Sequence, residues 1–524
     1  MAGVGLFALV GCNQIFGINP TRAYDAAIDV PPDQPHVLLN GQIATVLPPG
    51  PSGGGPDPTL AFVAIDPAPK LRISLLDPPT DSPELGELQP VDYQTSLEQE
   101  AGAILIPRGY RTQPWRLEYT LTDNVPHEVQ WLPADKQGHL TVPVFGRLMR
   151  SQPPSGSGYT ITPGNPPASY SGPRVFTTGQ WTEGAVIPVP APPTIVYSFD
   201  NALALAGANG RPEPAMGDLA LVADYASESA CRVAVGSAPI DPAMLTEGAL
   251  TAVSTTWNAN RESVIVDPVT GTDVLTRLND RLGNLGKLDM TESWLLFGSA
   301  AHASMPGLTA ARTSAALGRL RLPTPVMVSL LQCPAATTPL PMTAQPTVLD
   351  GFPRVLHVQL VAPRTALGIQ LVSGIETVLE ASAAAAASSG FKMAFPAPFP
   401  TQIELATPGA GVVALDGPDE QVAIGPASGA FVLRFQPELG AGLRADYHDV
   451  VLHKISGGAL TTERIYTVTQ PTVRIDGALL VPGADYVLEI RTYKGHPRAA
   501  QGDFAAVDYP YGATIVFTRT FKAS

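Results

Sequence analysis

The chain has 524 residues, of which 44% are hydrophobic, so it has enough apolar side chains to bury cores and is not wholly disordered. At about 150 residues per domain, this length predicts three or four domains. The formal net charge of −14 excludes a nucleic-acid polymer as a partner, because the body has no excess of cations to release counterions from phosphates.

The first twelve residues, MAGVGLFALVGC, form an apolar stretch that ends in a cysteine. The run at 9–12 (LVGC) resembles the bacterial lipobox, in which a branched apolar residue and small residues precede the cysteine that becomes the new N-terminus. The resemblance implies a lipoprotein signal peptide over 1–12 and acylation of Cys12 by palmitate-like chains, which anchor a protein to a membrane. The pattern departs from a secretory leader in that the first basic residue is Arg22. The alternative is a buried N-terminal strand with an incidental cysteine.

Residues 13–36 carry four prolines among Asp and Ala and show no sustained periodicity. This composition predicts a flexible tether that lifts the body away from the bilayer. Asn13 follows the acylated cysteine. In enteric lipoproteins an Asp at that position is the inner-membrane retention signal, so the resemblance favours the outer membrane or the cell surface.

The sequence has three cysteines. If Cys12 is acylated, Cys231 and Cys333 remain as an even pair, which is what one disulfide in an oxidising compartment needs. Closing a loop of about 100 residues would stabilise the fold by about 4–5 kcal/mol in the chain-entropy model. The alternative is two separate buried thiols, and the sequence leaves both possibilities open.

The body of the chain is predicted to be mainly β. Short runs of β-branched and aromatic residues stand between Pro and Gly, as at 115–122 and 430–435. The 55 prolines are incompatible with many long helices, because an interior proline costs about 3 kcal/mol. Two stretches are exceptions. Residues 273–290 have leucines at helical spacing, and residues 367–389 end in five alanines and are predicted as a helix or a low-complexity loop.

Stretches rich in Pro and Gly divide the body into units. Segment 152–173 is predicted as a long exposed loop or a linker, and segment 407–418 as the separator before the last unit. The expected units are a β domain at 37–187, a β-rich domain with some helix at 194–406 and a third unit at 419–524. The predicted fold class is therefore a mainly β, multi-domain β-sandwich protein.

The last hundred residues contain the clearest strand patterns, at 430–435, 447–455, 460–468, 472–477 and 513–521. Between the last two lies the segment LVPGADY, which begins at Leu480 and ends at Tyr486. This arrangement resembles a fibronectin type III domain, where such a Leu marks the loop that enters a strand and the Tyr hydroxyl bonds back to that loop. The resemblance implies an immunoglobulin-like sandwich with a structural tyrosine corner at Leu480 and Tyr486, and with Phe435 in the place of the family's Trp. That fold hosts many functions.

A broader resemblance rests on three short runs in the first 131 residues. The lipobox, the run NQIFG at 13–17 and the run PHEVQW at 126–131 look like parts of large bacterial surface lipoproteins, a group without a characterised activity. The resemblance therefore implies a location and an architecture, and it implies no reaction.

Motifs for catalysis or metal binding are missing from the sequence, which has no nucleophile elbow, no phosphate-binding loop and no His-Glu-x-x-His run. The densest histidine group is His448, Asp449 and His453. Neighbouring residues of a strand point to opposite faces, so His448 and Asp449 cannot chelate together, and an ordinary solvated strand is expected. We predict no catalytic residue, no metal and no cofactor.

Trp115 and Trp131, with His127 and Glu128 nearby, offer one candidate ligand site. Exposed aromatic rings can stack on sugar rings, whereas alternating strand geometry more often makes such tryptophans core residues. The core is the favoured interpretation.

The sequence as a whole favours a non-enzymatic lipoprotein of the bacterial envelope. It would bind the membrane through its lipid anchor and present a structural or interaction module to an unknown protein or glycan, with no nucleic acid. The alternative is a secreted or anchored hydrolase, or a glycan-binding protein, whose site is assembled from loops of the 194–406 domain.

Overall fold

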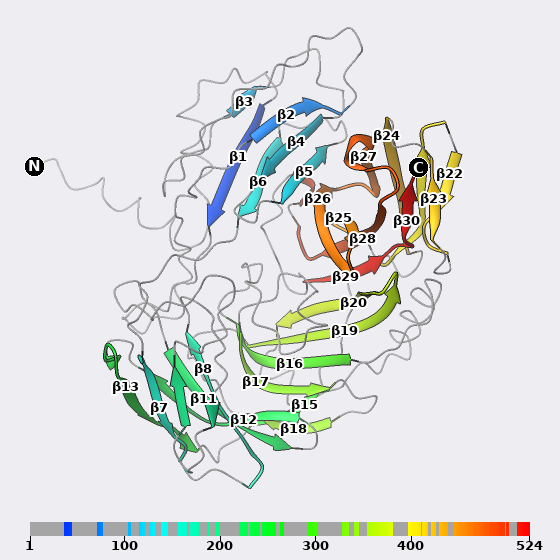
Figure 1. The fold of residues 1–524 in the computed structure, drawn as a ribbon. Coiled ribbons are helices and arrows are strands. Elements are labelled where there is room, and N and C mark those ends of the chain that lie inside the picture. Colours follow the sequence, from blue (N-terminus) through cyan, green and yellow to red (C-terminus); the bar gives the residue numbers. More distant parts are fainter. Residues whose placement is uncertain are drawn as a thin grey trace, which may run out of the picture.

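The protein is described by a computed structural model (Figure 1). The structure describes residues 36–43, 71–76, 103–105, 115–120, 125–131, 138–144, 156–164, 168–177, 187–188, 195–198, 220–228, 231–240, 244–257, 262–266, 292–300, 327–334, 340–344, 354–380, 397–409, 411–417, 421–425, 429–438, 444–497, 499–501 and 511–524. Cys12, the tether before His36 and the helical pattern at 273–290 lie outside the described residues.

The mainly β class is confirmed. Of the residues that can be interpreted, 69% lie in strands and 3% in helix. The helical part comprises two short 3-10 turns, η7 (Gly477–Leu479) and η8 (Ala499–Gln501). Within the described ranges, no helix has the length and apolar character needed to cross a membrane.

One large sheet connects strands from the whole length of the chain (Figure 1). Its neighbouring strands are, in spatial order, β2 (Leu71–Leu75), β4 (Trp115–Thr120), β5 (Pro126–Trp131), β26 (Ala459–Val468), β25 (Tyr447–Ser456), β28 (Asp485–Lys494), β29 (Tyr511–Phe517), β20 (Ile369–Glu380), β19 (Arg354–Ala366), β16 (Glu292–Ala300), β17 (Met327–Pro334), β12 (Cys231–Ile240), β11 (Ala220–Glu228) and β8 (Tyr170–Thr177). Three short strands extend it: β14 (Thr256–Trp257) beside β12, β30 (Phe521–Ala523) beside β28, and β23 (Val422–Ile424) beside β30. Most of these pairings are antiparallel, and β26–β5 and β23–β30 are parallel.

Four smaller sheets complete the described fold. The first contains, in spatial order, β3 (Ala103–Leu105), β1 (His36–Ile43) and β6 (Gly138–Val144), and the second contains β13 (Leu250–Ser254), β7 (Gly158–Thr162), β10 (Ile195–Ser198) and β9 (Ile187–Pro188). The third pairs β15 (Glu262–Val266) with β18 (Leu340–Ala344). The fourth contains, in spatial order, β22 (Gly411–Ala414), β21 (Pro400–Thr407), β24 (Ala430–Pro437) and β27 (Thr472–Asp476).

The large sheet joins all three stretches that the sequence divides into units. β5 pairs with β26, β20 pairs with β29, and β8 pairs with β11, so each pairing bridges two stretches. β21 and β22 lie before position 419, and β21 pairs with β24 of the C-terminal stretch. The molecule is therefore held together by strand pairing between distant segments.

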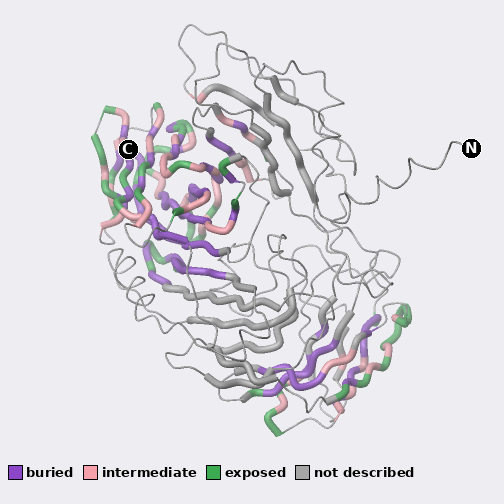
Figure 2. Tube along the Cα trace, turned by 180° about the vertical axis from the view of Figure 1, so that it is seen from behind, coloured by how far each residue is buried: buried purple, intermediate pink, exposed green. Residues whose placement is uncertain are grey.

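The C-terminal part contains two sheets that contact each other across a buried interior (Figure 2). Phe431, Leu433 and Phe435 alternate along β24 with exposed fractions of 0 to 2%. The ring of Phe435 meets the ring of His448 on β25 edge to face, with centroids 4.8 Å apart. The even-numbered residues of β25 therefore face the sheet that contains β24, and the odd-numbered residues face away from it.

Two sequence-based expectations are wrong where the structure describes them. The helix or low-complexity loop expected at 367–389 is a strand over residues 369–380, which form β20, and Leu367 and Gly368 make the turn of the β19–β20 hairpin with φ of 49° and 75°. The alanine run of that segment lies outside the described residues. Positive φ at both turn residues is what a two-residue hairpin needs. In 152–173, residues 158–162 form strand β7 and β8 begins at 170, because the side chains of the first strand pack into a buried cluster.

Candidate functional site

A polar junction lies where β5 of the N-terminal stretch pairs with β26 of the C-terminal stretch. The two strands are parallel, with Glu128 opposite Tyr466. On the other side of β5, antiparallel pairing sets Glu118 of β4 opposite Glu128 and Arg116 opposite Gln130. Because side chains alternate along a strand, these polar residues share one face of the sheet.

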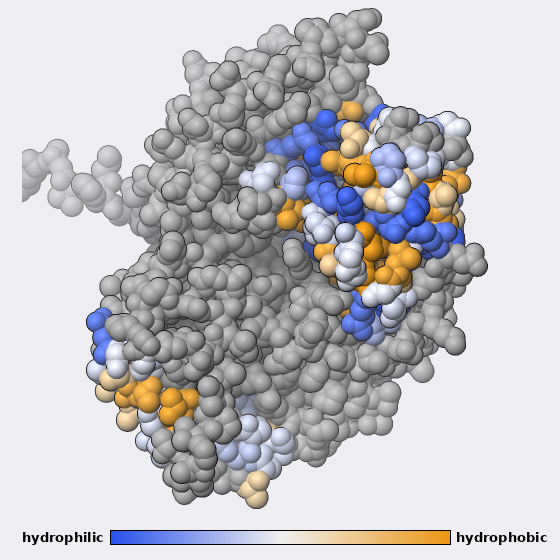
Figure 3. All heavy atoms as spheres, viewed as in Figure 1, coloured by the Kyte–Doolittle hydropathy of each residue, from blue (hydrophilic) through white to orange (hydrophobic). Residues whose placement is uncertain are grey.

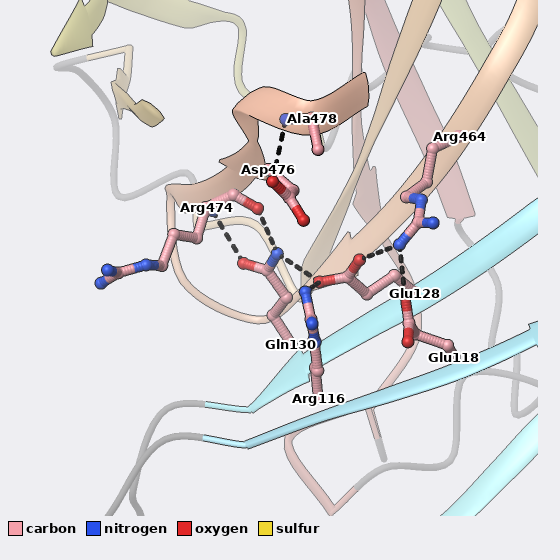
Figure 4. Close-up of polar contacts among 8 residues, drawn as sticks. All are labelled: Arg116, Glu118, Glu128, Gln130, Arg464, Arg474, Asp476 and Ala478. Atoms are coloured by element: carbon pink, nitrogen blue, oxygen red, sulfur yellow. Dashed lines mark hydrogen bonds and ion pairs between the residues drawn. The ribbon is translucent and has the colours of Figure 1, made fainter. Parts of the chain in front are cut away.

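A single arginine joins the two acidic side chains of this junction (Figure 4). Nη1 of Arg464 lies 2.5 Å from Oε1 of Glu118 and 2.7 Å from Oε2 of Glu128. Arg116 adds a second cation, 3.9 Å from Oε1 of Glu128. The Glu128 side chain is 1% exposed, so its charge is held by these cations in place of water.

Gln130 connects the junction to the neighbouring sheet. Its amide nitrogen donates to Oε1 of Glu128 at 2.8 Å and to the carbonyl of Arg474 at 2.5 Å, and its amide oxygen accepts from the backbone N–H of Arg474 at 2.8 Å. The side-chain amide of Gln130 thus hydrogen-bonds to the backbone N–H and C=O of Arg474. Arg474 belongs to β27, which is an end strand of its sheet. Covering such groups blocks pairing with another chain. In the next turn, Asp476 accepts from the N–H of Ala478 at 2.9 Å (Figure 4).

The electrostatics of the junction favour a structural role for Glu128. Burial raises the pKa of its carboxyl group, and the hydrogen bonds from Arg464 and Gln130 and the charge of Arg116 oppose that shift. Both carboxyl oxygens already accept hydrogen bonds from side chains. Glu128 is therefore engaged as a hydrogen-bond acceptor within the junction.

A second buried network lies on the outward face of β25 and β28. Nε2 of His453 is 2.8 Å from Oε2 of Glu489, and Nε of Arg491 donates to Oε1 of Glu489 at 2.6 Å. Asp449 lies directly opposite Arg491 and accepts from the Thr467 hydroxyl at 2.6 Å. The solvated strand expected at His448, Asp449 and His453 is wrong, because both faces of this part of the sheet are largely buried.

The two carboxylates of this network have opposite pKa shifts. Burial by itself raises the pKa of Glu489, but the charge and hydrogen bond of Arg491 and the hydrogen bond of His453 lower it to about 2. Burial raises the pKa of Asp449, and the Thr467 hydrogen bond and the Arg491 charge only partly oppose it. Arg491 is thus paired mainly with an ionised Glu489.

A third polar cluster lies between β8, β11 and the residues before β14. Asp224 is 4% exposed and accepts from the Tyr170 hydroxyl at 2.9 Å and from the Thr255 hydroxyl. Burial raises the pKa of Asp224, and these two hydrogen bonds oppose the shift. Gly236 on the neighbouring strand leaves room for the cluster, since a Cβ there would lie 2.9 Å from the carbonyl oxygen of Thr256.

His448, on the inward face of β25, makes a testable contribution to the pH dependence of stability. Burial lowers the pKa of its imidazole from 6.5 to about 3, and Nδ1 lies 3.0 Å from the Thr492 hydroxyl oxygen. Below pH 6.5 the unfolded chain therefore binds a proton that the folded chain does not bind. The wild type should lose stability relative to a His448→Gln variant between pH 6.5 and pH 3, by up to about 1.4 kcal/mol per pH unit.

Urea unfolding of both proteins across this pH range measures the effect. The free-energy difference between wild type and variant should be constant above pH 6.5 and should shift against the wild type below it. Parallel pH profiles would show that His448 is protonated in the folded protein or exposed to water.

The residues predicted from the sequence lie in several places. The Tyr486 hydroxyl accepts from the N–H of Val481 at 2.8 Å and donates to the carbonyl of Leu479 at 3.3 Å, and Leu480 is 3% exposed. Trp115 and Trp131 are opposite each other on β4 and β5. Glu128, considered with them for sugar binding, is turned to Arg464. The described residues contain no cluster of three or more potential metal ligands.

Sequence reasoning missed the two charged networks. One signal was present in the sequence. Arg116 and Glu118 are two positions apart in one expected strand, and Glu128 and Gln130 are two positions apart in the next, so each pair lies on one face of its strand. A half-buried strand normally alternates apolar with polar residues, so charges on one face indicate either solvent or a charged partner. The partner, Arg464, is 336 positions from Glu128 and is found only by folding the chain.

No family model matches the chain, and no curated protein matches its sequence.

Proposed function

We propose that this chain is a non-enzymatic lipoprotein of the bacterial envelope, anchored through Cys12, whose β-rich body is a structural or interaction module. One observation carries the non-enzymatic part of the proposal. The carboxylates of the three buried polar clusters are held by arginine, histidine, glutamine or hydroxyl groups of the same chain, such as Arg464 on Glu128 and Arg491 on Glu489. Such pairs fix the relative position of strands, because the folded geometry keeps their charges compensated.

We also propose that the C-terminal part is a fibronectin type III-like sandwich. Two observations support this. Its strands fall into the groups β22-β21-β24-β27 and β26-β25-β28-β29, and the Tyr486 hydroxyl bonds to the loop that precedes its strand. The visible face of this part carries hydrophilic and hydrophobic residues side by side (Figure 3), with Val412 and Val481 among the exposed apolar side chains.

The anchoring is tested by growing cells that express the full chain with an alkyne-labelled fatty acid. We expect label on the wild type and no label on a Cys12→Ala variant, which should also leave the membrane fraction. A Cys231→Ser variant is the matched control and should remain labelled. Mature wild-type protein that stays at the membrane without an acyl group would overturn the anchoring. Release of sugar from a polysaccharide panel by the purified chain would overturn the non-enzymatic part.

A further inference from the structure

The strands that carry Cys231 and Cys333 are neighbours in the large sheet. β12 and β17 are antiparallel, with Arg232 opposite Gln332 and Val233 opposite Leu331. In this register, one further step along the ladder sets Cys231 opposite Cys333. Cys231 is the first residue of β12, and Cys333 lies within β17, where it is also paired with Leu295 of β16.

This placement meets the geometric requirement of a disulfide. Residues directly opposite each other in an antiparallel pair have Cα atoms about 4.5 to 5.5 Å apart. Disulfides span Cα separations of about 4.4 to 6.8 Å. Two cysteines about 100 positions apart in the sequence thus reach bonding range through the strand register alone.

We propose that Cys231 and Cys333 form a cross-strand disulfide when the protein meets a disulfide donor. One thiolate attacks the donor and releases one donor thiol, and the second thiolate then displaces the other donor thiol from the mixed disulfide. One S–S bond forms in the protein, and two electrons and two protons pass to the donor.

The disulfide would fix the β12–β17 pairing covalently. The described β12–β17 ladder has two residue pairs, whereas β12 pairs with β11 along nine residue pairs. The β12–β17 pairing is also the step that connects β8 and β11 to the rest of the large sheet. A covalent bond at this step would secure that end of the sheet.

Peptide mapping tests the proposal on the full chain carrying Cys12→Ala, which removes the third thiol. The protein is purified in reduced form, treated with oxidised glutathione, alkylated without reduction and digested. We expect a linked pair of peptides containing Cys231 and Cys333, a mass lower by two hydrogens than the sum of the reduced peptides, and loss of alkylation at both positions. Reductant should restore alkylation at both.

Matched variants separate a specific bond from general reactivity. In a Cys333→Ser variant Cys231 should be alkylated, and in a Cys231→Ser variant Cys333 should be alkylated. The same mapping on protein isolated directly from an oxidising bacterial compartment covers the case in which the folded chain shields its thiols from glutathione. Alkylation of both cysteines in both samples, or links only between two chains, would overturn the proposal. Because the first sample is oxidised in vitro, this result is independent of where the protein resides.

Discussion

A Glu489→Gln variant should lower the free energy of unfolding by about 3–5 kcal/mol, because it removes the charge that compensates a buried arginine. The side chains of Glu489 and Arg491 are 4% and 7% exposed, and water therefore cannot take the place of the carboxylate. The amide of Gln keeps the shape of the side chain. The loss therefore reports the charge, and urea unfolding followed by circular dichroism measures it.

Asp485→Asn is the matched control, because it makes the same change from acid to amide in an exposed pair. Asp485 lies 3.7 Å from Nζ of Lys522, and the two side chains are 30% and 48% exposed. Such surface pairs contribute about 0–1 kcal/mol. Equal losses from Glu489→Gln and Asp485→Asn would show that the network around Arg491 is solvated.

The pH dependence gives this prediction a second readout. The pKa of Glu489 is lowered from 4.5 to about 2, so its stabilising effect is complete above pH 4.5 and is lost as the pH falls towards 2. The difference between wild type and Glu489→Gln should therefore shrink over that window. A difference that stays constant from pH 5 down to about pH 2 would contradict the ionised form of Glu489.

An Arg464→Met variant should open the junction between the N-terminal and C-terminal stretches. It leaves Glu128, with a 1% exposed side chain, beside Glu118 without their shared cation, at a cost of about 3 kcal/mol. The effect should be local, because Arg464 contacts β4 and β5 from β26. Amide hydrogen exchange of residues 127–131 should become about 100-fold faster, which is the factor that corresponds to this free energy.

Lys522→Met is the control for this change of cation to thioether, since the Lys522 side chain is 48% exposed. It should leave exchange in β5 unchanged. If Arg464→Met also leaves exchange in β5 unchanged, the parallel β5–β26 pairing is held by its backbone hydrogen bonds and the charges are dispensable. A uniform rise in exchange across the large sheet would show that the whole sheet unfolds as one unit.

The sequence predicts individual strands well where the signal is local. The strands expected at 430–435, 447–455 and 460–468 correspond to β24, β25 and β26 within one or two residues. Alternation of apolar side chains and the turn residues that bound them are properties of neighbouring positions, so they can be read without the fold. The same local reasoning failed at 369–380, where the alanine run that follows suggested a helix or a low-complexity loop and the hairpin turn went unrecognised.

The charged networks could not be predicted, because each depends on which segments cover a face. His453 and Asp449 were expected in solvent, since nothing near them in the sequence compensates a buried charge. Their environment is set by Arg491 and Glu489 on a strand about 40 positions away. Only when β25 and β28 pair does the cost of burial become small enough for the charges to stay inside.

By itself, the sequence determined the mainly β class, the strands of the last hundred residues and the structural pair Leu480 and Tyr486, whereas acylation of Cys12 stays a prediction. The tertiary structure alone decided that β5 joins β26, that Gln130 covers an end strand and that β12, which begins at Cys231, pairs with β17, which contains Cys333. The physical reason is that strand formation follows from side chains a few positions apart. Strand pairing also depends on the burial and charge compensation of segments that are tens to hundreds of positions apart.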